Sequence, residues 1–199
     1  MKTLKYLLVL IAILFVGFIL IGVFKPSINY GSELEINKPV KEAWAVMNDE
    51  SKTHLWLTGL ESSELISGTA GEVGAVTKIV MAPEGSEVME MTETITARKE
   101  NEHMGFAFEA AIVSSTLDMY FSTKNGKTIM QSNATAKGKG MLMKSLMPIM
   151  KSAMQKSDLE IMANLKKVIE ENTTDYFPQP KMEVSEMENT VMEIDATKG

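Results

Sequence analysis

The sequence contains no cysteine. Disulfide bonds, thiolate metal sites and cysteine nucleophiles are therefore excluded, and so is the processing of a bacterial lipoprotein. The absence leaves the compartment open, because reducing and oxidising compartments both tolerate chains without cysteine.

The sequence also lacks a surplus of positive charge. The chain carries 20 Lys and Arg against 26 Asp and Glu, for a net charge of -6. A negative chain is repelled by phosphate backbones, and nucleic-acid binders need a basic excess. We therefore expect no nucleic-acid partner.

Familiar catalytic and metal motifs are missing too. The only two histidines, His54 and His103, are not spaced as a pair of ligands on one helix face. The sequence has no G-x-S-x-G nucleophile turn, and its glycines do not match a phosphate-binding or dinucleotide-binding loop. We expect no metal, no cofactor and no identifiable catalytic residue, which leaves enzyme activity uncertain and favours a protein that is not an enzyme.

A long uncharged run is present at residues 6–24, YLLVLIAILFVGFILIGVF. As a helix it spans about 28 Å, close to the ~30 Å hydrocarbon core of a bilayer. A signal peptide has a shorter apolar region and small residues at its cleavage site, whereas bulky Leu20, Ile21 and Phe24 close this run. The sequence predicts an uncleaved, single-pass transmembrane anchor over residues 1–25.

Charge around the run predicts its orientation. Lys2 and Lys5 precede it, whereas Lys25 and Lys38 are mixed with Glu33 and Glu35 after it. The more basic side stays cytoplasmic. We expect a cytoplasmic N-terminus and a periplasmic or extracellular domain.

The rest of the chain divides into a linker at residues 26–32, one domain at 33–172 and an acidic tail at 173–199. Residues 33–37 alternate as a strand does, Pro39 starts a helix, and residues 51–57 form a second short helix. Turn residues then separate several strands, of which Asn125-Gly126 is the strongest hairpin signal because both tolerate positive φ.

Apolar alternation marks the later strands. Met104, Phe106 and Phe108 share one face of a strand, and Leu117, Met119 and Phe121 share one face of the next. Residues 128–136 show no clear alternation. A long helix follows from about Gly140 to Glu171, with Pro148 expected to kink it or mark its first turn. This order predicts an α+β fold.

Several of these segments, in this order, resemble the START-like superfamily, whose bacterial members are often labelled SRPBCC or polyketide cyclase/dehydrase-like. The resemblance covers residues 33–172 and rests on residues 35–44, Asp49 and Trp56, the turn at 71–74, the hairpin at 125–128, and residues 157–160 with 165–167. It implies a helix-grip fold, in which an antiparallel sheet curls around the C-terminal helix and leaves a cavity. Members bind or transform lipids, sterols, polyketides and other apolar molecules, and share no catalytic residues.

The candidate cavity residues combine the alternating strands with the methionine-rich helix. They are Met89, Met91, Glu93, Met104, Phe106, Phe108, Leu117, Met119, Phe121, Met150, Met154 and Ile161. Methionine suits a wall that adapts to different apolar ligands, although ordinary core filling is the better interpretation for any single one. Glu93 is in register with Met91 and Ile95, so it can face inward as a general acid or polar anchor. An outward Glu93 is favoured, because lone inward carboxylates are uncommon.

The tail loses clear periodicity, and Pro178 and Pro180 break any helix, so we expect it to be mostly disordered. Residues 182–187 and 191–194 are candidates for ordering on an envelope protein partner. The leading hypothesis is a membrane-tethered module that binds a lipid, an isoprenoid or a similar apolar ligand. The alternative is an assembly subunit without a ligand, and a cyclase-type enzyme comes third.

Overall fold

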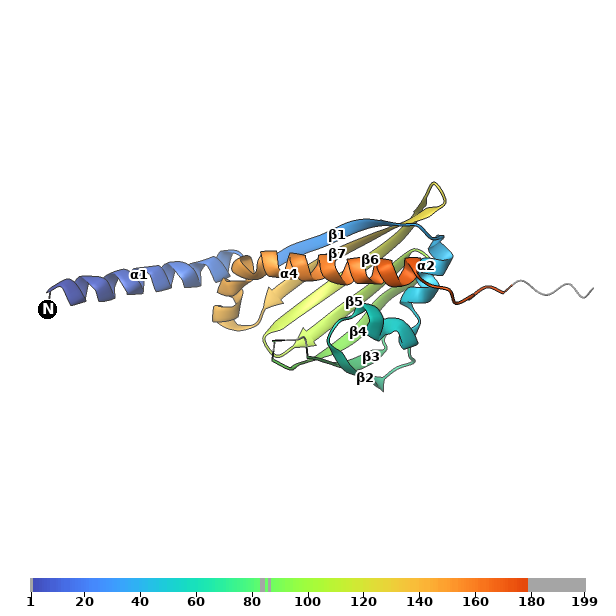
Figure 1. Cartoon of the computed structure of the whole chain (residues 1–199). Helices are drawn as coiled ribbons and strands as arrows, with labels where there is room; N and C mark the ends of the chain where they lie inside the picture. Colours follow the sequence, from blue (N-terminus) through green and yellow to red (C-terminus); the bar gives the residue numbers. More distant parts are fainter. Residues whose placement is uncertain (1, 83–84, 86, 179–199) are drawn as a thin grey trace, which may run out of the picture.

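The computed structural model describes residues 2–82, 85 and 87–178. A seven-stranded antiparallel sheet has the order β1-β7-β6-β5-β4-β3-β2, and the long helix α4 lies against it (Figure 1). The strands are β1 (Ser27–Ile36), β2 (Leu60–Ser67), β3 (Val76–Met81), β4 (Met89–Lys99), β5 (His103–Ala110), β6 (Val113–Lys124) and β7 (Lys127–Gly138). The helices are α1 (Lys2–Phe24), α2 (Val40–Met47), the 3-10 helix η1 (Glu50–Lys52), α3 (Thr53–Trp56) and α4 (Gly140–Glu170). The predicted α+β helix-grip fold is confirmed.

The predicted linker at residues 26–32 is wrong for all but its first residue. Ser27 already pairs with Lys137, so only two residues separate β1 from the end of α1. The polar residues of this segment look like a linker in the sequence. They form a strand because Tyr30 and Ser32 face α4, where Ser32 has hydrogen-bond partners.

In the structure, inward and outward residues alternate along the whole of β7, although the sequence shows no such alternation. Its inward residues are all buried, and all but Met130 are small or polar, namely Thr128, Met130, Ser132, Ala134, Ala136 and Gly138. Small side chains are needed here because α4 packs directly on β7 and β1. Hydrophobicity alone therefore does not mark the inward face of this strand.

Three hydrogen bonds fix α4 to the sheet. Asp158 Oδ2 accepts hydrogen bonds from Ser32 Oγ at 2.7 Å and from Ser132 Oγ at 2.9 Å, which joins α4 to both β1 and β7. One turn earlier, Gln155 Nε2 donates to the Gly31 carbonyl at 2.6 Å. The first turns of α4, in the part that contains Pro148, run in a different direction from the rest of the helix (Figure 1), in agreement with the predicted kink.

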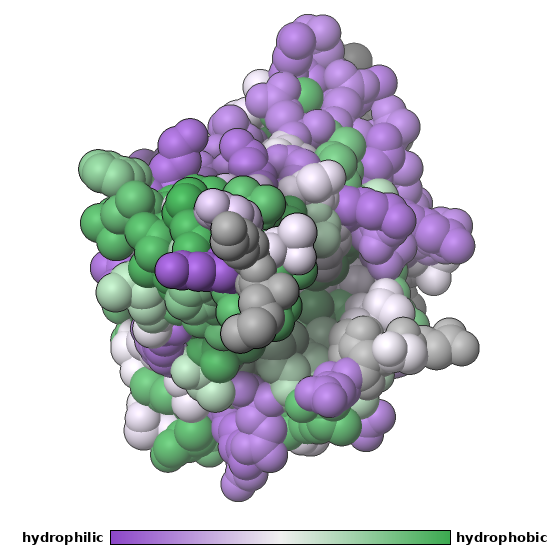
Figure 2. Space-filling model, turned by 90° about the vertical axis from the view of Figure 1, so that its left-hand side faces the viewer, coloured by the Kyte–Doolittle hydropathy of each residue, from purple (hydrophilic) through white to green (hydrophobic). Residues whose placement is uncertain are grey.

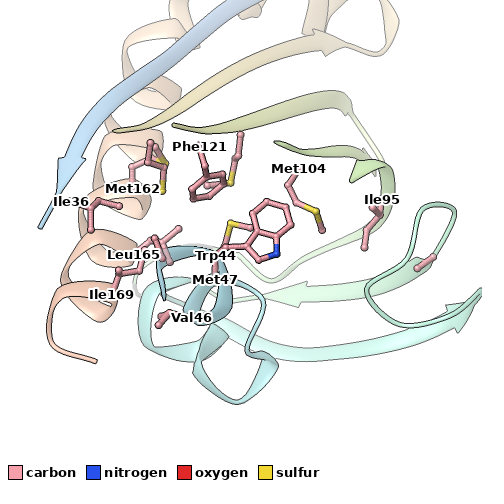
Figure 3. Close-up of a cluster of buried hydrophobic side chains, with 14 residues drawn as sticks. Ile36, Trp44, Val46, Met47, Ile95, Met104, Phe121, Met162, Leu165 and Ile169 are labelled. Atoms are coloured by element: carbon pink, nitrogen blue, oxygen red, sulfur yellow. The ribbon is translucent and has the colours of Figure 1, made fainter. Parts of the chain in front are cut away.

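The main core fills the end of the sheet at which α4 finishes. Trp44 from α2 lies near its centre, with Phe121 edge-on to its ring at a centroid distance of 5.5 Å (Figure 3). Leu165 and Ile169 of α4 close the core from one side and are fully buried. Helix α2 thereby joins the sheet to the C-terminal half of α4.

The first residues of the predicted tail pack on the domain. Tyr176 contacts the core, and its hydroxyl donates to Asp49 Oδ2 at 2.5 Å. Lys52 Nζ also donates to Thr174 Oγ1 at 3.0 Å. The prediction that the tail is disordered is therefore wrong for its first residues, up to Tyr176, whereas residues 179–199, with the candidate segments 182–187 and 191–194, lie outside the described residues.

Helix α1 contacts the domain through its last turns. Gly22 is buried against Ser145 of α4, and a Cβ atom at Gly22 would come within 2.6 Å of the Ser145 backbone nitrogen. Only glycine permits this approach. Most of α1 is otherwise exposed, and it is long and apolar enough to cross a membrane, a test that a signal sequence also passes.

The Asp158 contacts predict a large effect on stability. We expect Asp158→Ala to lower the free energy of unfolding by about 2–3 kcal/mol, because two part-buried serine hydroxyls lose a charged acceptor. Unfolding of the full chain in detergent, followed by Trp fluorescence, measures this change. The control is Glu160→Ala, which removes an exposed carboxylate on the same helix and should change stability by less than about 0.5 kcal/mol. Equal effects of the two variants would contradict the assignment.

Candidate functional site

The inner face of the sheet is only partly covered by α4. The helix makes its main sheet contacts with β1 and β7 at one edge, so the inner face of β3 to β6 is left facing a space. We call this space the hollow. Figure 2 shows it as a recess with apolar and weakly polar side chains at its floor.

Aromatic and aliphatic side chains form the floor of the hollow. Phe106 and Phe108 point inward from β5, with ring centroids 6.1 Å apart, and Leu117 lies opposite Phe106 on β6. All three are half-buried, whereas residues of the closed core are below one-tenth exposed. Phe106 and Leu117 also pack against the edge of that core. Large apolar side chains that remain accessible inside a fold are a feature of apolar ligand sites.

One flank of α4 faces the hollow. Met150, Met154 and Ile161 recur along the helix on the side turned away from Gln155, which bonds β1. Each is half-buried. Met150 and Met154 also pack against a small second core of Ile28, Ala136 and Met147. The two methionines are unbranched and polarizable, so this wall can adapt to ligands of different shape.

Glu93 faces the hollow from β4, so the favoured outward orientation is wrong. It lies directly opposite Phe108 on one side and Thr77 on the other, on the same face as buried Ile95. Burial raises the pKa of Glu93 from 4.5 to about 7, and no described residue forms a hydrogen bond or ion pair with its carboxyl group. Lone inward carboxylates are uncommon because desolvation disfavours the charge, so Glu93 is a candidate functional residue.

Two polar neighbours of Glu93 were not predicted from the sequence. Thr77 and Ser115 lie in the same cross-strand row as Glu93 and Phe108 and are half-buried. The alternation of inward and outward residues along the paired strands identifies Thr77 and Ser115 once Glu93 is known to face inward. Trp56 was also missed: its indole N–H is buried with no acceptor among the described residues, and it packs on the main core.

The other predicted cavity residues separate into three groups. Met91, Phe106, Phe108, Leu117, Met150, Met154 and Ile161 are half-buried and border the hollow with Glu93. Met104, Met119 and Phe121 are buried in the main core instead, because they lie at the end of the sheet that α2 covers. Met89 is exposed at the first residue of β4, on the rim.

The remaining candidate groups lie outside the hollow. His103 points to the outer face of the sheet, where it stacks on Tyr120 and lies 2.8 Å from Asp118, and His54 is exposed. The described residues contain no cluster that could hold a metal ion. A separate surface pocket of about 540 Å³ lies beside the end of α4 and is lined mainly by polar residues, Lys52, Asn164, Lys167 and Glu171 among them.

The sheet, the gripped helix and the hollow agree with a family model described as polyketide cyclase / dehydrase and lipid transport, which matches residues 29–170. The chain belongs to this family. The matched residues run from the third residue of β1 to the last of α4, so the family model covers the sheet and the gripped helix, and α1 lies outside it. No curated protein sequence matches the chain closely enough to count as a relative.

Solved structures share the fold of this family member at low sequence identity. Ara h 8.0201 superposes with a TM-score of 0.61 at 15% identity, covering 73% of this chain and 99% of its own. TTHA0849 from Thermus thermophilus gives 0.61 at 15%, covering 74% and 100%. The Zhui aromatase/cyclase from Streptomyces sp. R1128 gives 0.55 at 10%, covering 71% and 94%. These likenesses show the fold alone.

The raised pKa of Glu93 predicts a pH-dependent stability. The folded state binds more protons than the unfolded state between pH 4.5 and about 7, so the free energy of unfolding falls as the pH rises through this window. Glu93→Gln cannot lose a proton, so we expect it to match the wild type below the window and to exceed it by up to about 3 kcal/mol above it. Chemical unfolding across the pH range measures the difference.

Glu90→Gln is the matched control, because Glu90 lies on the outer face of the same strand and pairs with Lys78 at 3.0 Å. This variant should keep the pH dependence of the wild type in the window. If Glu93→Gln also keeps it, Glu93 is solvated in the folded protein.

Proposed function

We propose that this protein is a membrane-tethered binding module that holds an apolar ligand, a lipid or an isoprenoid, in the hollow. The observation that carries the proposal is a half-open apolar floor with one inward carboxyl group at its centre. The described residues close the main core around Trp44, but they leave Phe106, Phe108 and Leu117 partly accessible. An apolar ligand would remove that surface from water.

Glu93 restricts the kind of ligand. A pKa of about 7 makes the neutral carboxyl group readily available near neutral pH, and in that form it both donates and accepts a hydrogen bond. Thr77 and Ser115 add hydroxyl groups in the same row. The ligand that fits best is therefore a long apolar molecule with a single hydroxyl or carbonyl group, because a bare hydrocarbon would leave Glu93 without a partner.

The tether is α1. Its apolar length supports a transmembrane span, and its bulky C-terminal residues do not suit a signal peptidase. The basic N-terminus supports a cytoplasmic start with the domain on the periplasmic or extracellular side. In this arrangement the domain lies next to the bilayer, which is the reservoir of the proposed ligands.

A cyclase-type enzyme is the second candidate, and Glu93 is the residue that favours it. A carboxylic acid with a pKa near 7 is a competent general acid or base. No described histidine faces the hollow to share the proton transfers, so Glu93 would have to act alone. We therefore place binding before catalysis.

Filling the hollow should reduce ligand uptake more than stability. We expect Phe108→Trp to weaken binding of the neutral fluorophore N-phenylnaphthylamine several-fold, while the free energy of unfolding changes by less than about 1 kcal/mol, because the added ring occupies space. Phe106→Trp should act in the same way. Fluorescence titration and native mass spectrometry of copurifying lipids give the two binding measurements.

Phe121→Trp is the matched control, since Phe121 is buried in the main core. Overpacking there should lower stability by about 1–3 kcal/mol and leave the affinity of the folded protein unchanged. The proposal fails if Phe108→Trp destabilises as Phe121→Trp does and leaves binding untouched.

The tether makes a separate prediction. Protein from the native host should have an intact mass that includes residues 2–24, and alkaline carbonate should leave it in the membrane pellet. Protease added outside spheroplasts should degrade the domain if the proposed orientation holds. A mature N-terminus beyond Phe24 would instead identify α1 as a cleaved signal sequence.

A further inference from the structure

The strand pairing brings several connections to the end of the domain from which α1 leaves. Ser27 lies opposite Lys137, Val113 opposite Gly138, and Met81 opposite Met89. The start of β1, the β3–β4 and β5–β6 connections and the start of α4 therefore meet at one end of the sheet, and α1 extends from it (Figure 1). We call this the anchor end.

Exposed apolar side chains gather at the anchor end. Val88 is 66% exposed in front of β4, and Ile112 is 58% exposed between β5 and β6. The first turns of α4 add Met141, Leu142 and Ile149, each more than half exposed. They come from three separate parts of the chain, so no single amphipathic segment accounts for them.

Lysines accompany these apolar residues. Lys25, Lys137 and Lys151 are exposed near the anchor end, and Lys139 is close enough to Glu109 for an ion pair at 2.6 Å. Long basic side chains beside apolar ones suit a membrane interface, where the amine reaches the phosphate layer. Glu87 is the exposed acid next to Val88 on this rim.

The junction with α1 leaves the domain little room to move away from the bilayer. Only Lys25 and Pro26 separate α1 from β1, and the Lys25 amide still donates to the Ile21 carbonyl at 2.8 Å. Two extended residues span at most about 7 Å. The contact of Gly22 with Ser145 holds the first turns of α4 at the same level as the end of α1.

Figure 2 views the molecule from the anchor end, and the hollow opens on this side. We propose that the anchor end lies in the interfacial layer of the bilayer that α1 spans, with Val88, Ile112 and Leu142 among the lipid chains. The hollow then opens directly onto the membrane, and a ligand passes between the two without crossing water. This inference rests on the proposed tether and ligand site.

The absence of cysteine makes a direct depth measurement possible, because each introduced cysteine is the only one. The full chain, reconstituted in phosphatidylcholine–phosphatidylglycerol vesicles, is labelled with an environment-sensitive NBD fluorophore at Val88→Cys or Ile112→Cys. We expect blue-shifted emission and quenching by lipids that carry a nitroxide on the acyl chain. Val73→Cys is the matched control, because Val73 is equally exposed, at 57%, in the β2–β3 turn at the opposite end.

Leu14→Cys in the middle of α1 separates this inference from the tether. If Leu14 is quenched while Ile112 and Val88 behave as Val73 does, the tether stands and docking is overturned. If Leu14 is not quenched, the span fails and docking fails with it. Thermal unfolding of each labelled protein verifies that the domain is folded.

Transfer of an NBD-labelled sterol, which carries a single hydroxyl group, between vesicles tests the consequence for uptake. Ile112→Glu together with Val88→Glu should slow the protein-dependent transfer several-fold, whereas Val73→Glu should not. If no variant, nor the wild type, transfers the sterol while Ile112 is quenched in the bilayer, the docking holds and the sterol is not the ligand. Equal transfer by the wild type and the double variant would overturn the role of the rim in uptake.

Discussion

The architecture depends on where α4 is attached to the sheet. Asp158 binds Ser32 and Ser132 together, and Gln155 binds the backbone of Gly31, so the helix is held over β1 and β7 at the sheet edge. A charged acceptor shared by two hydroxyls is directional, whereas apolar packing alone would let the helix slide toward the middle of the sheet. The edge attachment leaves β3 to β6 uncovered, and the hollow is the result.

The two halves of the interior differ because of this attachment. At one end α2 inserts Trp44 between the sheet and the C-terminal half of α4, and the core is closed (Figure 3). Toward the other end no such element covers β4 and β5 among the described residues, so Phe106, Phe108 and Glu93 remain partly accessible. One half of the domain interior therefore forms the closed core that stabilises the fold, and the other half leaves a candidate ligand site.

Much of this could be predicted from the sequence, for identifiable reasons. Local sequence signals mark the long helix, the Asn125-Gly126 turn and strands β5 and β6. In the structure Asn125 and Gly126 both have the positive φ that this turn requires. The inward face of β7 could not be predicted, because five of its six inward residues are small or polar and only Met130 is a large apolar side chain. The same holds for β1, whose polar start is satisfied by a helix more than a hundred residues later.

The orientation of Glu93 shows a different limit. Its register with Met91 and Ile95 indicates that the Glu93 side chain faces inward, whereas the rarity of lone buried carboxylates favours an outward side chain. General expectations of this kind describe residues that contribute to stability, and the inward position of Glu93 departs from them. The packing of Tyr176 could not be predicted for another reason. Its contact with Asp49 joins two segments that are far apart in the sequence, and neither segment carries a local signal of the pairing.

The short junction between α1 and β1 has a mechanical consequence. Helix α1 is joined to the domain through only two residues and packs on it at Gly22, so the helix and the domain move as one rigid body. A transmembrane helix tilts when the bilayer becomes thinner than its hydrophobic length. If α1 spans a bilayer as proposed, such a tilt would rotate the whole domain, and bilayer thickness would set the angle between the sheet and the membrane.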